Sequence, residues 1–277
     1  MRKLKWSQLT GMNQHYRRYS FEEYLDSMLS CGIESLELWC GAPHFMLDPK
    51  NFSDPKPYER MARERGMRFV SVCAPSMMWQ YQFGVEGRER QKKAVAYYQN
   101  GIRVAAALGC KIMSINAGWG YRDEPANESM KRSAEAILKA ADLAEREGVT
   151  LALETLQPTE SNMVLTLKDA RAFYKKLNHP AVKMMIDTVA AGVAGETVED
   201  WFLAFGKDLV HCHFVDGSPS GHKVFGDGNY PVVSMLHTFE RFDYQGFLTM
   251  ELGGSYINDP FSADKRNTEG LRKLIAN

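Results

Sequence analysis

Short runs of apolar residues alternate with longer amphipathic stretches along the whole chain. This alternation is typical of successive βα units, in which a helix connects each strand to the next parallel strand. Eight of the short runs are apolar or β-branched at most positions, as strands buried on both faces of a sheet should be. The predicted strands span residues 4–10, 35–40, 68–74, 111–117, 150–156, 182–188, 209–215 and 247–252.

The stretches between these strands have the periodicity of amphipathic helices. In residues 128–147, for example, apolar side chains recur at helical spacing from Met130 to Ala144. Several predicted helices end just before a strand at a glycine, namely at Gly32, Gly66, Gly109 and Gly148. Glycine tolerates the left-handed conformation that turns the chain back to the sheet, so we expect these glycines to end helices.

The length of the chain favours a closed barrel. Divided among eight units, 277 residues give about 35 residues per unit, and a (β/α)8 barrel takes about 250 residues in one domain. An open, doubly wound sheet would use the same alternation, but it would carry a glycine-rich phosphate loop after its first strand. Residues 10–13 contain one glycine, and no GxxxxGK[ST] motif occurs. The sequence therefore predicts an α/β fold, a (β/α)8 TIM barrel, with residues 1–277 forming a single domain.

Charge and composition narrow the class of partner. Lys plus Arg and Asp plus Glu both number 34, and no basic stripe with interleaved aromatic residues occurs, so we expect no nucleic-acid partner. No apolar stretch is long enough to span a bilayer, and residues 1–20 lack the apolar core of a signal peptide. We therefore expect a cytoplasmic protein with no membrane partner. The five cysteines form no CxxC pair and are expected to be reduced core residues.

Ionisable residues end four of the predicted strands, the fifth to the eighth. They are Glu154, Asp187, His213 and Glu251. In a parallel barrel, catalytic side chains come from the carboxyl ends of the strands. Any one of these residues could be a solvated polar residue at a loop entry. Four of them on successive strands favour a common site.

A divalent cation would explain this combination of residues. Three carboxylates directed into an apolar barrel mouth would repel one another and lose solvation, which is costly unless a cation neutralises them. Carboxylates with one imidazole suit Mn²⁺, Mg²⁺ or Co²⁺, and Zn²⁺ remains an alternative. His211 should face the same side of the strand as His213, one layer deeper. We expect it to be a hydrogen-bonded core histidine or a group that supports the site.

Motifs around these residues resemble those of a known family. The motifs are residues 36–39 with Pro43-His44, 153–154 with 160–162, 185–187, 211–216, 226–228, 251–252 and 256–260. Through them, nearly the whole chain resembles the sugar isomerase and epimerase superfamily of xylose isomerase-like barrels. Within that superfamily it is most similar to the ketose 3-epimerase branch, and there to the fructoselysine 3-epimerases.

The resemblance implies an activity and a cofactor. It makes Glu154, Asp187, His213 and Glu251 the ligands of one divalent metal ion, most often Mn²⁺, and gives Glu154 and Glu251 a second role as acid and base. A ketose 3-epimerase removes the proton on C3 from one face and returns a proton on the other, through an enediolate that the metal stabilises. The predicted function is inversion of C3 of a ketose or a ketose derivative such as fructoselysine. A homodimer or homotetramer is also implied.

Three polar residues are candidates for contacts with the sugar. The resemblance places a substrate-binding carboxylate at Glu160 and substrate contacts in the loop that carries His222, and we expect His44 to hydrogen-bond a sugar hydroxyl. The alternatives are helix capping for Glu160, loop packing for His44 and a solvated position for His222.

Aromatic residues follow the second, third and fourth predicted strands. These are Trp39, Trp79, Trp119 and Tyr121. They could stack on the faces of a sugar or merely roof the barrel. We expect Trp39 and Trp119 to be substrate contacts.

The chain departs from the family pattern at two positions. Well-studied ketose 3-epimerases carry a histidine three residues after the aspartate ligand and an arginine six residues after the histidine ligand. This chain has Ala190 and Pro219 there. Because both family residues contact the reacting part of free ketoses, the departures favour a larger or modified sugar.

Three alternative functions remain open from the sequence. An aldose-ketose isomerase shares the proton chemistry, and the sequence does not separate it from an epimerase. An endonuclease of the same superfamily would need zinc-binding histidines on other strands, whereas the third and fourth strands here lead into Ala74-Pro75 and Asn116-Ala117. A non-catalytic sugar-binding barrel is disfavoured by the intact Glu154 and Glu251.

Overall fold

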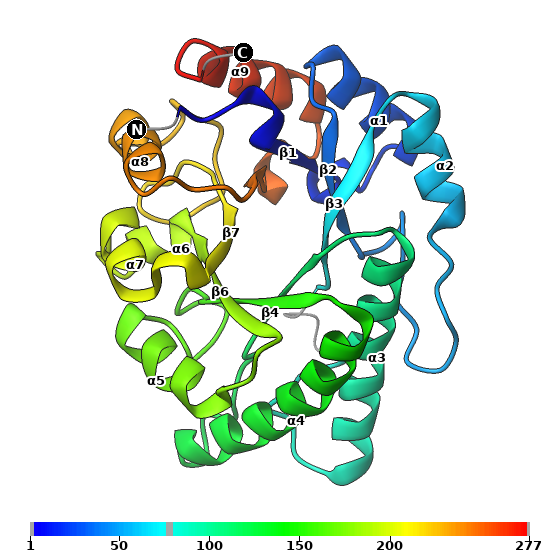
Figure 1. Cartoon of the computed structure of the whole chain (residues 1–277), viewed down its shortest axis with the longest axis vertical. Coiled ribbons are helices and arrows are strands. Elements are labelled where there is room, and N and C mark those ends of the chain that lie inside the picture. Colours follow the sequence, from blue (N-terminus) through cyan, green and yellow to red (C-terminus); the bar gives the residue numbers. More distant parts are fainter. Residues whose placement is uncertain (1–2, 76–79, 276–277) are drawn as a thin grey trace.

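The computed structural model of the chain describes residues 3–75 and 80–275. Eight parallel strands close into a barrel, in which each strand pairs with its neighbours in the sequence and the last pairs with the first (Figure 1). The predicted fold class, a (β/α)8 TIM barrel, is confirmed. The strands are β1 Leu9–Met12, β2 Ser35–Trp39, β3 Arg68–Cys73, β4 Ile112–Asn116, β5 Thr150–Glu154, β6 Val182–Asp187, β7 Leu209–His213 and β8 Leu248–Met250.

Seven of the eight strands start within one residue of the predicted position and end one or two residues earlier than predicted. The first strand differs more. The prediction placed it at residues 4–10, whereas β1 starts at Leu9 after the 3-10 helix η1, Trp6–Gln8. The Gln8 side chain holds this turn, because it accepts a hydrogen bond from the Lys5 amide and donates one to the Gly246 carbonyl oxygen. Such polar contacts leave no trace in an apolar pattern.

Helices surround the strands in chain order (Figure 1). The prediction of a helix over residues 128–147 is confirmed, with α4 starting two residues earlier, at Ala126. The helices are α1 Phe21–Ser30, α2 Lys56–Glu64, α3 Arg88–Ala107, α4 Ala126–Glu147, α5 Leu167–Leu177, α6 Thr188–Val193, α7 Val198–Phe205, α8 Val232–Arg241 and α9 Pro260–Arg272. Three further 3-10 helices are η2 Gln14–Tyr16, η3 Gly206–Asp208 and η4 Gly254–Tyr256.

The four glycines expected to end helices have left-handed backbone conformations. Their φ angles are 68° at Gly32, 72° at Gly66, 70° at Gly109 and 66° at Gly148. Residues with a Cβ atom adopt this region at a cost. The glycines therefore fix the points at which α1, α2, α3 and α4 turn back toward the barrel.

The main apolar core lies between the helices and the barrel. Most of the helices contribute large side chains that are almost completely buried, such as Leu25 on α1, Ile102 on α3, Ile137 on α4, Phe173 on α5 and Trp201 on α7. Burial of a side chain of this size contributes about 1.5–3 kcal/mol to stability. This layer keeps the strands, and so the residues at their carboxyl ends, in fixed positions.

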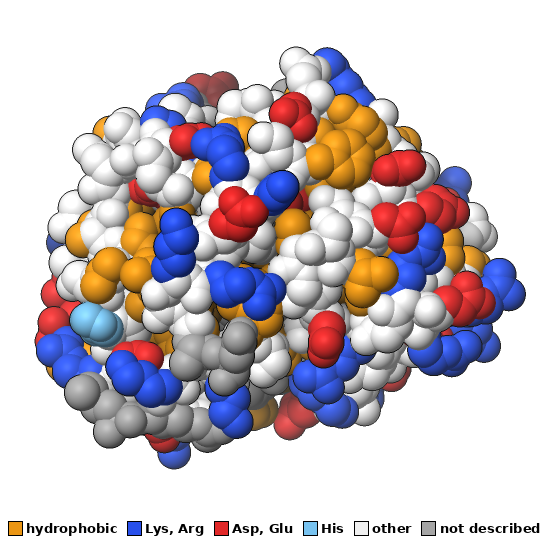
Figure 2. All heavy atoms as spheres, turned by 90° about the horizontal axis from the view of Figure 1, so that it is seen from above, with side chains coloured by type: hydrophobic (Ala, Val, Ile, Leu, Met, Phe, Trp, Pro, Cys, Tyr) orange, Lys and Arg blue, Asp and Glu red, His pale blue; other side chains and the backbone are white. Residues whose placement is uncertain are grey.

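The surface and the cysteines add little chemistry of their own. Basic and acidic side chains are interspersed on the face shown in Figure 2. No helix in the described part of the chain is long and apolar enough to cross a membrane. The five cysteines are free, as predicted, and four of them are buried.

The left-handed glycines provide a test of the fold. At Gly66 an added Cβ atom would meet nothing within 4 Å, so Gly66→Ala changes only the backbone preference. We expect it to lower the free energy of unfolding by about 1–2 kcal/mol in urea denaturation followed by circular dichroism. Gly270→Ala is the matched control, since its Cβ also meets nothing but the residue lies in α9. There we expect a gain of about 0.5–1 kcal/mol, and a loss at Gly270 equal to that at Gly66 would contradict the account.

Candidate metal centre and adjoining pocket

Four ionisable side chains converge at the carboxyl ends of successive strands. Glu154, Asp187 and His213 are the last residues of β5, β6 and β7, and Glu251 directly follows β8. One ligand atom from each of the four lies within 4.8 Å of the others. The structure therefore brings together all four residues that the sequence predicted as metal ligands, because the carboxyl ends of parallel strands meet at one end of a barrel.

His213 lies between two of the carboxylates. Its Nδ1 atom is 2.7 Å from Glu154 Oε1 and 2.7 Å from Glu251 Oε2. Nevertheless, His213 Nδ1 and Glu154 Oε1 are both buried and neither has a hydrogen-bond partner within the described chain. Buried polar atoms without partners are costly. A cation held between these atoms would satisfy both of them, so the geometry fits a metal ion.

The donor set also fits a divalent cation. It consists of three carboxylates and one imidazole without a thiolate, a set that suits Mn²⁺, Mg²⁺ or Co²⁺ and also accommodates Zn²⁺. The His213 side chain is fully buried, whereas 11% of the Glu154 side chain and 14% of the Glu251 side chain are exposed. The two glutamates thus border open space, where a substrate could reach them and the ion.

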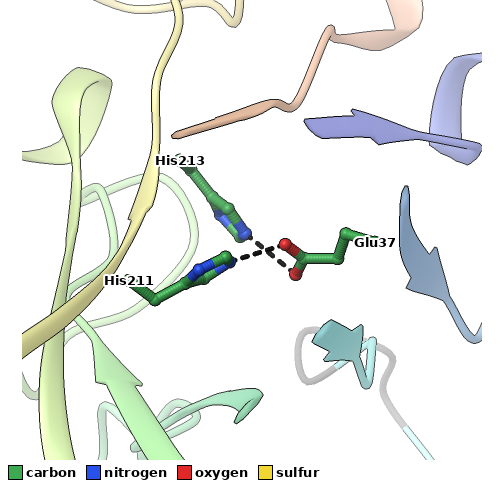
Figure 3. Close-up of side chains that lie close together, drawn as sticks. All are labelled: Glu37, His211 and His213. Atoms are coloured by element: carbon green, nitrogen blue, oxygen red, sulfur yellow. Dashed lines mark hydrogen bonds and ion pairs between the residues drawn. The ribbon is translucent and has the colours of Figure 1, made fainter. Parts of the chain in front are cut away.

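The second nitrogen of the His213 ring is held from inside the barrel. His213 Nε2 donates to Glu37 Oε1 at 3.3 Å, and His211 Nε2 donates to Glu37 Oε2 at 2.6 Å (Figure 3). Because a carboxylate can only accept these bonds, the proton of the His213 ring lies on Nε2 and Nδ1 is free to act as a ligand. Metal-binding histidines are commonly oriented by a carboxylate in this way.

Glu37 is the functional residue that sequence reasoning missed. It lies in the middle of β2, fully buried, and also accepts hydrogen bonds from Ser71 at 2.9 Å and Thr249 at 2.7 Å. Burial raises the pKa of its carboxyl group, but His211 and His213 outweigh burial and hold that pKa well below its usual value. The signal was a charged residue inside an otherwise apolar strand, which is rare unless the charge is paired.

Glu37, His211 and His213 also place three ligand atoms within 4.8 Å of one another. In this group, however, hydrogen bonds already engage both carboxylate oxygens and the Nε2 atoms of the two rings. We therefore interpret it as a hydrogen-bonded support below the candidate metal site. The prediction that His211 is a hydrogen-bonded core histidine is confirmed.

Without a metal ion, the candidate site holds protons. Burial raises the pKa of the Glu154 carboxyl group to about 8, although His213 acts in the opposite direction. Burial lowers the pKa of His213, but the carboxylates of Glu251, Glu154 and Glu37 outweigh burial and hold that pKa well above its usual value. A cation has to displace these protons, so its affinity should depend on pH.

A pocket of about 260 Å³ adjoins the four candidate ligands. Predicted substrate residues Trp39, Glu160 and His222 are part of its wall, and so are the two residues Gln14 and Arg17 from the segment after β1. The remaining lining residues, apart from the candidate metal-binding carboxylates, are Cys73, Ala74, Pro75, Ser114, Ile115, Asn116, Leu156, Gly253 and Gly254.

His222 contacts the candidate ligands directly. Its Nε2 atom donates to Asp187 Oδ2 at 2.9 Å and lies 3.7 Å from Glu251 Oε2. Burial lowers the pKa of His222, but Asp187 outweighs burial and raises this pKa to about 10. The cationic form of His222 therefore offsets part of the negative charge in the pocket.

Glu160 lines the pocket near a local turn. Its Oε2 atom accepts a hydrogen bond from the Gln157 amide at 2.9 Å. Burial raises the pKa of its carboxyl group. The next helix, α5, is capped by Thr166 and Asp169, so the alternative interpretation of Glu160 as a helix cap is wrong.

The predicted aromatic contacts separate in the structure. Trp39 is buried in the wall of the pocket. Trp119 borders a different cavity of about 370 Å³, together with Tyr81 and Tyr121. Trp79 lies outside the described residues. Of these aromatic residues, Trp39 therefore has the geometry for stacking on a sugar beside the candidate ligands.

His44 is buried beside the pocket and is not part of its described wall. Its Nδ1 atom is 3.2 Å from Asn13 Nδ2, and its Nε2 atom is 2.8 Å from the Tyr19 carbonyl oxygen. Asn13 in turn bonds the backbone of Trp39 in both directions, at 2.8 and 3.1 Å. Both ring nitrogens are thus engaged within the protein, an arrangement that matches the packing role weighed as the alternative, and direct binding of a sugar by His44 stays a prediction.

Binding of Mn²⁺ to the metal-free protein should strengthen as pH rises. Protons compete with the ion at Glu154, whose pKa is about 8, and at His213, whose pKa is held well above its usual value. Affinity should therefore fall by at least tenfold for each pH unit below about 8 and depend less steeply on pH above it. Calorimetric titrations between pH 6 and pH 9 measure this dependence and should give one ion per chain. Glu154→Gln should weaken binding and flatten the slope by one proton, whereas an unchanged affinity across this range would contradict the proposed site.

Glu37→Gln should weaken Mn²⁺ binding although Glu37 is not one of the candidate ligands. The amide keeps the shape of Glu37 but loses the charge that fixes the His213 ring, so we expect a loss of about 10- to 100-fold. Ser114→Ala is the control, because its hydroxyl makes only a 3.4 Å contact with Glu37. Thermal unfolding should show that both variants fold. If the folded Glu37→Gln variant bound Mn²⁺ as tightly as the unchanged protein, the proposed role of Glu37 in orienting the His213 ring would be wrong.

Comparisons with known proteins agree with the fold. Residues 25–275 match the family described as Xylose isomerase-like TIM barrel. Fructoselysine 3-epimerase of Shigella flexneri is 24% identical over 262 residues, which cover 94% of this chain and 95% of that protein.

Two solved structures are similar in fold. D-psicose 3-epimerase from Clostridium cellulolyticum H10 with D-tagatose has a TM-score of 0.76, 18% identity and coverage of 97% of this chain and 99% of that chain. Apo 3-keto-D-glucoside 4-epimerase from E. coli has a TM-score of 0.79, 17% identity and coverage of 96% and 99%.

The family match covers β2 to β8, including all four strand ends that carry the candidate ligands. The closed parallel barrel has the topology that the family description names. This chain belongs to the xylose isomerase-like TIM barrel family.

Proposed function

We propose that this protein is a carbohydrate epimerase, an enzyme of the isomerase class, that inverts C3 of a ketose or ketose derivative with the help of one divalent metal ion. The observation that carries the proposal is the pair of carboxylates, Glu154 and Glu251, each 2.7 Å from the same nitrogen of His213. They reach the site from β5 and from the end of β8, so two acid-base groups border one ion. The relatives named above are epimerases of sugars, and fructoselysine is named for one of them.

In this proposal the ion is Mn²⁺, and its ligands are Glu154, Asp187, His213 and Glu251. When bound, the ion supplies Lewis-acid stabilisation of negative charge on the sugar oxygens next to C3. Asp187 contributes negative charge to the site but takes no part in proton transfer in this proposal, because its oxygens already accept hydrogen bonds from His222 and from the Val189 amide.

Glu154 and Glu251 move the proton. One carboxylate takes the proton from C3, which leaves the electron pair shared over C2 and C3 of the sugar. The other, protonated, carboxyl group gives a proton to the opposite face of C3. The reaction is redox-neutral, and the two groups exchange roles in the reverse direction.

The pocket wall orients the sugar in this proposal. Glu160 and His222 offer polar groups for hydroxyls, and Trp39 offers an apolar ring face. The absence of a histidine at Ala190 and of an arginine at Pro219 still favours a modified sugar over a simple hexulose. Location in the cytoplasm and assembly into a homodimer or homotetramer stay predictions.

Solvent deuterium separates the possible reactions. The Mn²⁺-loaded protein is incubated in D₂O with fructoselysine, psicose, tagatose or fructose, each separately, and the sugar is followed by NMR. We expect deuterium to enter C3 of fructoselysine and the C3 epimer to form. Exchange of a free ketose at C1 with an aldose product would instead identify an aldose-ketose isomerase. No exchange in any of these sugars by metal-loaded protein would contradict the proposal and favour a sugar-binding role.

Variants of the two glutamates test the acid-base assignment. Glu154→Gln and Glu251→Gln should each lower kcat/KM about 100- to 10,000-fold at Mn²⁺ concentrations that keep the site filled. Glu135→Gln is the control, since Glu135 is an exposed residue of α4 and is not part of the described pocket wall. Full activity in either site variant would exclude that residue as a proton-transfer group.

A further inference from the structure

One positively charged side chain in the pocket has no hydrogen-bond or ion-pair partner among the described residues. Arg17 directly follows η2, in the segment after β1, and lines the same pocket as the candidate metal ligands. Its Nε atom is buried without a hydrogen-bond partner, and its guanidinium group forms no ion pair with any described residue. The neighbouring Arg18 behaves differently, because it is exposed and donates to Asn258 Oδ1 at 2.6 Å.

The surroundings hold the guanidinium group inside the pocket wall. Its central carbon lies 5.8 Å from the ring centre of Trp39, within the range of a cation-π contact. In addition, a Cβ atom added to Gly254 would lie 3.3 Å from Arg17 Nη2. Gly254 begins η4, three residues after the candidate ligand Glu251. Arg17 therefore lies between an aromatic wall and the turn that follows the metal site.

A second unpartnered group comes from the same turn. Gln14 Oε1 is buried, lines the pocket and has no hydrogen-bond partner within the described chain. Gln14 and Arg17 are three residues apart, one turn of a 3-10 helix, so they present their ends on one side. Unpartnered buried polar groups in a pocket are costly unless a ligand completes their hydrogen bonds.

We propose that Arg17 is the anion-binding residue of this pocket and that the natural substrate is a ketose carrying an acid group, either a carboxylate or a phosphate. The guanidinium fork matches two oxygens of such a group and provides strong, charge-assisted hydrogen bonds. Gln14 adds an amide that can donate to the same acid group or accept from a nearby hydroxyl. This inference rests on the proposed epimerase function, because it names the substrate class of that site.

The alternative role for Arg17 is to balance the charge of the pocket. Glu154, Glu160, Asp187 and Glu251 are all in its wall. Asp187 is already paired with His222, and none of the four lies within 4.0 Å of the Arg17 guanidinium nitrogens. Charge balance would act on every sugar alike, whereas an anion site should distinguish acidic from neutral sugars. This difference makes the two roles separable.

Calorimetric binding to the Mn²⁺-loaded protein separates the roles. The first ligand pair is fructoselysine and the fructosyl derivative of cadaverine, which lacks only the carboxylate. The second pair is ribulose 5-phosphate and ribulose, which differ by the phosphate. We expect one ligand with an acid group to bind more tightly than its counterpart without that group, and the pair that shows this preference identifies carboxylate or phosphate as the acid group.

Arg17→Gln should then weaken binding of the preferred ligand with an acid group roughly 10- to 150-fold and leave binding of its counterpart without that group within about threefold. Arg17→Lys should recover part of the loss, since it restores charge without the fork. Arg18→Gln, which removes an adjacent surface charge, should leave both affinities unchanged.

Equal losses of affinity in Arg17→Gln for the ligand with the acid group and for its counterpart without it would overturn the proposal in favour of charge balance. Equal affinities of the unchanged protein for both members of each pair, or no binding of either acidic ligand, would also overturn it. Because affinity is read from the binding titration and not from product formation, a failure to exchange deuterium at C3 would refute the epimerase function without deciding the role of Arg17.

Discussion

The site depends on the two-sided contact of the His213 ring. On the inner side, Nε2 donates to Glu37, and on the outer side Nδ1 lies 2.7 Å from the oxygens of Glu154 and Glu251. Glu37 therefore fixes the orientation of the ring and the position of its proton, and the ring determines where a cation can be held. Replacing the apolar packing of the barrel interior with a buried charge is costly, and the hydrogen bonds that Glu37 accepts from Ser71, Thr249 and His211 offset this cost.

The barrel arranges three layers of chemistry along one axis. The innermost layer is the hydrogen-bonded group around Glu37, the next is the set of candidate ligands at the ends of β5 to β8, and the outermost is the pocket formed by the loops. The half of the barrel from β5 to β8 supplies the candidate ligands, whereas the segment after β1 supplies Arg17 and Gln14. The proposed function therefore assigns chemistry at the ion and selection of the sugar to different parts of the fold, and changes in the loops could alter the substrate without disturbing the candidate ligands.

Much of this arrangement could be predicted from the sequence because it follows from periodicity. Apolar runs give the strands, and the ends of those strands give Glu154, Asp187, His213 and Glu251. Glu37 was harder, since a charge within an apolar run reveals its importance only when the ring of His213 is placed beside it. Arg17 was missed because its importance lies in the lack of a partner, which no pattern of residue types contains. For Trp119, the position after β4 predicted a contact with the sugar, whereas the residue borders another cavity, so this contact stays a prediction.

The most direct test of the central claim is a crystal structure of the Mn²⁺-loaded protein with anomalous diffraction data collected above the manganese absorption edge. The account predicts one anomalous peak, bonded to His213 Nδ1 and to carboxylate oxygens of Glu154, Asp187 and Glu251, with His213 Nε2 still bonded to Glu37. A peak bonded to Glu37 and His211 instead, or no peak among the four strand-end residues, would contradict it.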